Sequence, residues 1–318
     1  MSSLLKLIQN ENMKIYYRIG TWVMVILLLI AVIGMGIFVK TTSDENDNWQ
    51  VAVQTDIKRL QAQKEKTESF KFMNEEVLKS YDRQIEIKEY RLANNIPPLP
   101  ADSFWGFINE SSNLTSFVTL FTIVIAAGMV ASEFSWGTIK LLLIRPVSRS
   151  KILLSKYLST LLFAFSLLAV LFLSSALTGG LLFGFDSVSQ PHLTYTDGAV
   201  KEVGMLQNMI GIYGLNSVDL VILSTFAFMM SSVFRSSSLA IGLSIFLMFI
   251  GPQISNLLRN YEWSKYILFA NTNLRQYIDG IPFMEGMTMT FSISVLIGYF
   301  VIFVSLSWLA FTKRDVTA

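Results

Sequence analysis

Six long runs of apolar residues constrain this chain more than any other feature of its sequence. A helix needs about 20 mostly apolar residues to cross the hydrocarbon core of a bilayer, and the six runs approach or exceed that length. They cover residues 21–39, 114–131, 152–185, 212–234, 239–254 and 289–311. Only 15% of the residues are charged, against about 25% in soluble proteins. We therefore predict an all-α integral membrane protein with six transmembrane helices.

Two of these runs carry further expectations about the shape of their helices. The run 152–185 is longer than one bilayer requires, so its helix must tilt, bend near Gly179 and Gly180, or begin in the interface. The run 239–254 is expected to stop at Gly251 and Pro252, because proline cannot continue the hydrogen-bond ladder of a helix. The run 21–39 is too long for a signal peptide, and we expect it to be retained.

The distribution of basic residues predicts the orientation in the membrane. With the N-terminus inside, the cytoplasmic segments hold eleven Lys and Arg residues, and the two short outside loops hold four. Basic residues are enriched in short cytoplasmic loops, whereas long segments translocate regardless of charge. We therefore expect both termini in the cytoplasm, with residues 40–113 outside the membrane.

The segment 40–113 is predicted to form an extracellular helical domain. Residues 49–94 lack Gly and Pro and are rich in Lys, Glu, Gln and Leu, which favours helix. A seam of Leu78, Tyr81, Ile85, Lys88 and Leu92, with an upstream fragment at Ile57 and Leu60, predicts two helices packed as a hairpin. We expect its turn near residues 70–74. A solvated spacer and a surface that contacts a substrate or partner both fit this pattern.

Residues 1–20 are predicted to form an amphipathic helix in the inner membrane interface. Apolar side chains such as Leu4, Ile8 and Ile15 fall on one side, and Lys6, Asn10, Lys14 and Arg18 fall on another. A cytoplasmic tail that only sets the orientation is the alternative.

The loop between the second and third runs is the most informative segment. In residues 131–159, Glu133 lies at the inner membrane edge, and Gly137 and Thr138 open a short apolar helix. Arg145 and Pro146 break that helix, and Ser148 is placed to cap the next one. The predicted element is an amphipathic helix on the cytoplasmic surface, joined to two spans, which is suited to transmit a push from a soluble partner.

This loop resembles the permease subunits of bacterial type-2 ABC exporters. In that family a glutamate, a Gly-Thr-apolar run and a Pro-apolar-Ser/Thr-Arg-x-Lys stretch precede the third span. The matching positions here are Glu133, Gly137, Thr138, residues 141–144, Pro146, Ser148, Arg149, Lys151 and Lys156. The N-terminal segment resembles the connecting helix of the family at Glu11, Lys14 and Arg18. Residues 256–287, with an apolar core at 267–270 and a break at Pro282, resemble its extracellular re-entrant gate.

The resemblance implies a transport subunit that works with separate ATPase subunits, on which ATP and Mg are bound. The coupling region 133–151 would contact the ATPase through Glu133, Gly137, Thr138, Lys140, Arg145, Pro146, Arg149 and Lys151. It also implies a second permease copy, in a homodimer or a heterodimer. The 74 residues outside exceed the short first loop of the minimal fold, which suggests a subgroup that exports peptide antibiotics, as in antibiotic resistance, or lipids.

Composition and motifs disfavour other classes of function. The sequence contains no G-x-x-x-x-G-K-[ST] loop for nucleotide phosphates. It has no Cys and a single His192, so we expect no metal site, no catalytic residues and no bound cofactor. Dispersed basic residues and a net charge of +2 give no footprint for nucleic acid. A ligand sensor or scaffold without an ATPase remains the alternative, and an intramembrane enzyme is disfavoured because no catalytic motif is present.

Two ionisable residues lie in notable places. Asp219 falls within the run 212–234, and an ionisable residue in a span suggests a functional polar site. If that span begins near Val218, Asp219 would instead be an N-terminal helix charge in the headgroups. His192, in the polar loop after the third run, is expected to be solvated.

Overall fold

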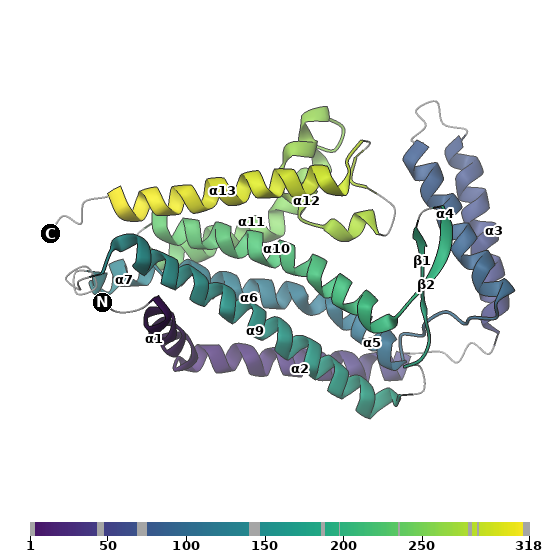
Figure 1. The fold of residues 1–318 in the computed structure, drawn as a ribbon, viewed down its shortest axis with the longest axis horizontal. Coiled ribbons are helices and arrows are strands. Elements are labelled where there is room, and N and C mark those ends of the chain that lie inside the picture. The colour runs from purple at the N-terminus through teal and green to yellow at the C-terminus, as the bar shows by residue number, and fades with distance from the viewer. Residues whose placement is uncertain are drawn as a thin grey trace.

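The computed structural model describes most of the chain. The described residues are 4–42, 48–68, 75–139, 147–185, 188–196, 198–234, 236–278, 282–284 and 286–313. The fold is an elongated helical bundle (Figure 1), in which both chain ends and α7 (Ala131–Ser135) lie at one end. A pair of helices, α3 (Trp49–Glu68) and α4 (Glu75–Ala93), lies at the other end.

Six segments are long and apolar enough to span a membrane, as the sequence predicts. They are α2 (Ile19–Thr42), the combined α5 (Phe104–Ser111), η1 (Ser112–Leu114) and α6 (Thr115–Gly128), α9 (Arg149–Phe183), α10 (Met205–Val233), α11 (Ser237–Leu257) and α13 (Met289–Lys313). In the most apolar windows, 67% of the second span and 56% of α10 are buried, against 17% of α11 and of α13. The second span and α10 therefore form the centre of the bundle, and α11 and α13 present most of their apolar side chains outward. This is the pattern of helices that face lipid.

The second span begins at Phe104, ten residues before the predicted start. Ser103 caps it by accepting a hydrogen bond from the backbone N–H of Gly106 at 3.1 Å. Phe107 and Ile108 are fully buried in the bundle. The predicted boundary of the outside domain at residue 113 is therefore too late. The polar residues 109–113 interrupt the apolar run, so hydropathy alone did not assign the first two turns of the helix to the span.

Helix α9 runs as one continuous helix from Arg149 through Gly179 and Gly180 to Phe183. One expectation about a helix break is corrected by the structure. Helix α11 does not stop at Gly251 and Pro252 but continues to Leu257. A proline inside a membrane-spanning helix is tolerated where neighbouring elements and local adjustments satisfy the freed backbone groups.

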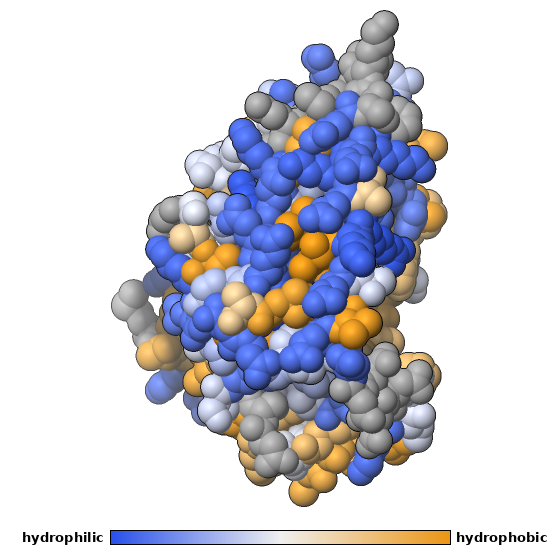
Figure 2. Space-filling view, turned by 90° about the vertical axis from the view of Figure 1, so that its right-hand side faces the viewer, coloured by the Kyte–Doolittle hydropathy of each residue, from blue (hydrophilic) through white to orange (hydrophobic). Residues whose placement is uncertain are grey.

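Helices α3 and α4 pack against each other in opposite directions. Lys64 binds Asp82 at 2.6 Å and Lys88 binds Asp56 at 2.8 Å. The earlier residue of α3, Asp56, thus pairs with the later residue of α4, Lys88, as two antiparallel helices require. Val53 and Ile57 of α3 are buried at this contact. The predicted turn at 70–74 lies outside the described residues. Figure 2 shows this end of the molecule as a mainly hydrophilic face crossed by a band of hydrophobic residues.

A two-stranded antiparallel ribbon joins α9 to α10, where a polar loop was expected. Its strands are β1 (His192–Thr196) and β2 (Ala199–Val203), with His192 opposite Val203 and Thr196 opposite Ala199. The Tyr90 hydroxyl of α4 donates to Glu202 of β2 at 3.3 Å, which fixes the ribbon against the helix pair. Apart from this ribbon, the elements that the structure describes are helices.

Between α11 and α13 the chain forms three short helices, η2 (Glu262–Tyr266), α12 (Leu268–Asn271) and η3 (Leu274–Tyr277). Asn271 is fully buried and holds this segment together. Its amide donates to the carbonyls of Lys265 and Ile267, each at 2.8 Å, and accepts from the Ser292 hydroxyl of α13 at 2.6 Å. The segment predicted at 256–287 is therefore folded back onto the bundle.

Candidate functional site

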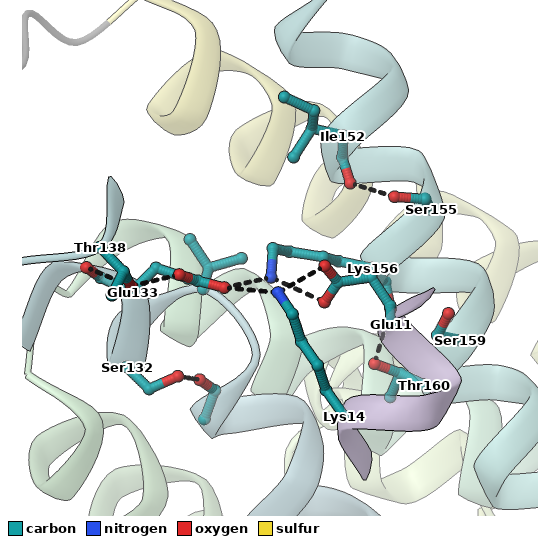
Figure 3. A network of polar contacts seen from close by, with 12 residues as sticks. Glu11, Lys14, Ser132, Glu133, Thr138, Ile152, Ser155, Lys156, Ser159 and Thr160 are labelled. Atoms are coloured by element: carbon teal, nitrogen blue, oxygen red, sulfur yellow. Dashed lines mark hydrogen bonds and ion pairs between the residues drawn. The ribbon is translucent and has the colours of Figure 1, made fainter. Parts of the chain in front are cut away.

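Three elements meet at the end of the bundle that carries the chain ends. They are the N-terminal helix α1 (Leu4–Tyr16), the short helix α7 after the second span, and the first turns of α9. Each supplies a charged side chain to one cluster, which consists of Glu11, Lys14, Glu133 and Lys156 and which we call the polar lock. Figure 3 shows these side chains converging from separate elements.

Lys156 is the centre of the polar lock. Its ammonium lies 2.8 Å from a Glu11 oxygen and 2.9 Å from a Glu133 oxygen. Lys14 binds the same two carboxylates at 2.9 Å and 3.3 Å. The Thr138 hydroxyl donates to the other oxygen of Glu133. Two cations and two carboxylates thus balance, and each carboxylate bridges both cations.

The polar lock is buried enough for its charges to matter. Lys156 is 1% exposed, and Glu11 is 6% exposed. Burial alone would raise the pKa of Glu133, but the charge of Lys156, hydrogen bonds from Thr138 and Lys156, and the charge of Lys14 lower it to about 2. Burial lowers the pKa of Lys14, yet the two carboxylates outweigh this and leave it raised. Both groups are therefore charged at neutral pH.

Local sequence explains how α1 reaches the polar lock. Glu11 and Lys14 are three residues apart, so they share one face of the helix. That face lies on α9, where Ser159 donates to the Ile8 carbonyl at 3.2 Å and Tyr16 hydrogen-bonds Ser166 at 2.6 Å. The polar residue Glu11 is thus part of the buried face of α1, whereas Leu5, on the predicted apolar side, is 76% exposed.

A second contact joins the turn between α1 and α2 to the loop after α7. The guanidinium of Arg18 lies over the ring of Trp136, 5.5 Å from its centroid, which is a favourable cation–π arrangement. Gly137 follows with a φ of +71°, a conformation that favours glycine. A cavity of about 420 Å³ opens between these elements and is lined in part by Arg18, Glu133 and Thr138.

The structure places the predicted coupling residues in three groups. Glu133 belongs to the polar lock, Thr138 donates a hydrogen bond to it, and Gly137 is next to Thr138 in the chain. Arg149 donates to the carbonyl of Thr312 at 3.1 Å and so holds the end of α13, and Lys151 is exposed on the first turn of α9. Lys140, Arg145 and Pro146 lie outside the described residues.

Asp219 lies far from the polar lock. It is the fifteenth residue of α10, so the interpretation as an N-terminal helix charge is wrong, because the dipole acts only within the first turn. It lines a separate cavity of about 610 Å³ with Asn216, Thr272 and Arg275.

His192 is partly buried at the start of β1 rather than solvated. Its burial and the nearby charge of Arg91 lower its pKa. Within the part of the chain that the structure describes, no group of three or more His, Asp or Glu side chains is placed to hold a metal ion.

Sequence reasoning did not find the pairing that makes the site. Lys156 ends the motif of the coupling loop, but its partner Glu11 is 145 residues away. The signal available was a lone lysine one or two turns into an apolar run, because a buried cation in such a place requires a carboxylate partner.

Comparisons with known proteins show a family match over most of the chain and two similar uncharacterised proteins. Residues 70–317 match the model of a family described as "Protein of unknown function (DUF2705)". The Bacillus subtilis (strain 168) "Uncharacterized protein YhcI" is 42% identical over 318 residues, which covers 98% of this chain and 99% of the relative. The "Uncharacterized membrane protein YdbK" of the same organism is 33% identical over 218 residues, 68% of this chain and 84% of the relative.

Proposed function

We propose that this chain, which belongs to the DUF2705 family, is the membrane-spanning permease subunit of a type-2 ABC exporter. In this role it moves a hydrophobic or amphipathic substrate outward across the bacterial plasma membrane. The ATP and Mg that drive the movement are bound by separate ATPase subunits. Two permease copies form one conduit, since the six spans of one chain offer only half of it.

The observation that carries this proposal is the polar lock. It ties together the two segments whose sequences resemble the exporter family, the N-terminal helix and the loop after the second span, and it anchors both on the third span. A buried charge that loses its partner is costly, so these three elements are favoured to move as one body. A force applied to the loop at 137–151 then reaches α9 directly, as transport driven from the cytoplasm requires.

The basic residues at the start of α9 support an anionic partner outside the chain. A helix N-terminus carries partial positive charge, so Arg149 and Lys151 in the first turn are unfavourable for the helix itself. Arg149 is held by the end of α13, whereas Lys151 is exposed. Acidic residues of an ATPase at this surface would offset the unfavourable placement, and we assign the docking contact to Lys151.

The different character of the two ends of the helical bundle supports the orientation predicted from the basic residues. In this orientation the polar lock, α7 and both termini face the cytoplasm, and α1 lies in the inner interface. The helix pair α3–α4 and the β-ribbon then form the extracellular domain, and the folded-back segment α12–η3 lies near the outer surface, where it would act as the gate.

The test is mild-detergent purification of the tagged chain from its native cells, followed by mass spectrometry of co-purifying proteins. We expect a stoichiometric partner with a P-loop, and we expect Lys151→Glu to remove it while the chain still inserts. The matched control is Lys265→Glu, which reverses a charge in the segment at the other end of the bundle and should leave the partner bound.

Reproducible absence of a P-loop protein from the intact, folded chain would refute the exporter and favour a sensor or scaffold. Retention of the ATPase by Lys151→Glu would refute the docking contact alone. Equal loss in both variants would show that general charge, and not this surface, controls the association.

A further inference from the structure

A polar cavity lies inside the membrane-spanning part of the bundle. It occupies about 610 Å³ between the interrupted second span, α10, α11 and the segment α12–η3. Its charged and polar lining includes Asn113, Thr115, Asn216, Asp219, Thr272 and Arg275, and its apolar lining includes Leu223, Met248 and Phe269. Polar walls at this depth are costly to maintain, so they are typically kept for a ligand.

The backbone around this cavity is irregular where a spanning helix would ordinarily be continuous. The second span is interrupted by η1, which begins nine residues into its 25 residues. Facing it are the short helices α12 and η3, whose residues line the same cavity. A 3₁₀ stretch inside a longer helix often marks a functional hinge or a sequence under strain.

Two opposite charges line this cavity without neutralising each other. Asp219 lies in the middle of α10 and lines the cavity together with Thr272. The Arg275 guanidinium donates to the Ser112 hydroxyl at 3.2 Å. Among the residues that the structure describes, no ion pair joins Asp219 to Arg275 within 4.0 Å. The cavity therefore offers an anionic point and a cationic point at separate positions.

Thr115 gives an independent sign that a ligand completes the cavity. It lines the cavity, is 6% exposed, and its hydroxyl oxygen has no hydrogen-bond partner among the residues that the structure describes. Buried polar groups are almost always hydrogen-bonded, and each exception calls for a missing partner. A polar group of a bound molecule would satisfy Thr115.

We propose that this cavity binds the zwitterionic headgroup of a phospholipid. Its ammonium lies beside Asp219, its phosphate lies beside Arg275, and its acyl chains run along Met248 and Phe269. A headgroup with both charges satisfies both points at once, whereas a simple anion or cation leaves one of them without an ionic partner. The proposal rests on the proposed function in one respect, that an exporter would carry this molecule as its cargo.

The test is native mass spectrometry of the purified chain with three lipids that share the same acyl chains. Phosphatidylethanolamine has an ammonium and a phosphate, phosphatidylglycerol has only the phosphate charge, and a trimethylammonium-propane lipid has only the cation. We expect the wild-type chain to prefer phosphatidylethanolamine over the other two by about tenfold, since a hydrogen bond to a charged group contributes that much or more.

The variants separate the two charges. Asp219→Asn should lose the preference over phosphatidylglycerol, and Arg275→Gln should lose the preference over the cationic lipid. Asp219→Glu, which keeps the charge, should retain the first preference. Asp102→Asn and Lys265→Gln change matched charges away from the cavity and should alter neither. Equal binding of the three lipids by the wild-type chain, or full preference in Asp219→Asn, would overturn the proposal.

This experiment needs no ATPase and so separates the two proposals. An ATPase partner without a lipid preference would overturn the headgroup site and leave the exporter standing. A lipid preference without an ATPase partner would leave a lipid-binding membrane protein and overturn the exporter.

Discussion

The ammonium of Lys156 lies 2.8 Å from Glu11 and 2.9 Å from Glu133, although 145 residues separate Lys156 from Glu11 along the chain. This one side chain joins the N-terminal helix, the loop after the second span and the third span. Lys14 binds the same two carboxylates. Removal of Lys156, or of one carboxylate, therefore leaves the cluster with a net charge.

The first prediction follows from this imbalance. Lys156→Met leaves two carboxylates with the single cation of Lys14, so it should lower the free energy of unfolding by about 3–5 kcal/mol, as for a buried pair that loses one partner. The measurement is chemical or thermal unfolding of the purified chain in detergent. Lys151→Met, at an exposed position one turn earlier, should change the free energy by less than about 0.5 kcal/mol.

A triple variant distinguishes loss of charge balance from loss of packing. Glu11→Gln, Glu133→Gln and Lys156→Met together remove the buried carboxylates along with their cation. Replacement of a whole buried ionic group is often close to neutral, so the triple variant should recover most of the stability that Lys156→Met loses. Additive losses over the three positions would contradict an electrostatic origin.

The second prediction concerns pH. The pKa of Glu133 is lowered from 4.5 to about 2, so its ionised form stabilises the fold fully above the unfolded pKa. That contribution is lost as the pH falls from about 4.5 towards 2, where the folded state also binds the proton. The difference in melting temperature between the wild type and Glu133→Gln should therefore be constant near neutral pH and shrink in acid.

At alkaline pH the sign is reversed for Lys14, whose pKa is raised above 10.5. Its contribution is full below the unfolded pKa and is lost as the pH rises through the folded one. The contributions of Glu133 and Lys14 should thus be insensitive to pH between about 5 and 10. A loss of the wild-type advantage near pH 7 would contradict this assignment of charges.

The third prediction tests orientation with single cysteines, which the chain lacks naturally. Lys58→Cys lies on an exposed face of α3, and Lys151→Cys lies at the exposed start of α9. In intact cells, a membrane-impermeant maleimide should label position 58 and should label position 151 only after the membrane is opened. The reverse pattern would place the polar lock outside and remove the basis for a cytoplasmic ATPase.

Hydropathy was sufficient to predict the six spans but not their ends. The long apolar runs at 21–39 and 289–311 are confirmed as helices. Neither run contains a proline or a charged residue that would favour another structure. Pro252 misled the prediction of α11, since a rule from exposed helices does not hold where neighbours satisfy the backbone. The β-ribbon was missed although Asp197-Gly198 between two alternating runs is a hairpin signal. The contact of Glu11 with Lys156 depends on packing between distant elements, which no local pattern specifies.

The last prediction compares two glycines of α11. A methyl group at Gly251 would lie 2.2 Å from a ring carbon of Phe269, whereas one at Gly242 would meet nothing within 4 Å. Ala is favoured over Gly inside a helix by about 1 kcal/mol, so Gly242→Ala should be neutral or stabilising. Gly251→Ala should instead lower the free energy of unfolding by about 1–3 kcal/mol, because Phe269 must move.

Since Phe269 also lines the polar cavity, Gly251→Ala should weaken lipid binding in native mass spectrometry, and Gly242→Ala should not. Equal behaviour of the two variants would mean that α12 does not pack against α11 at this point.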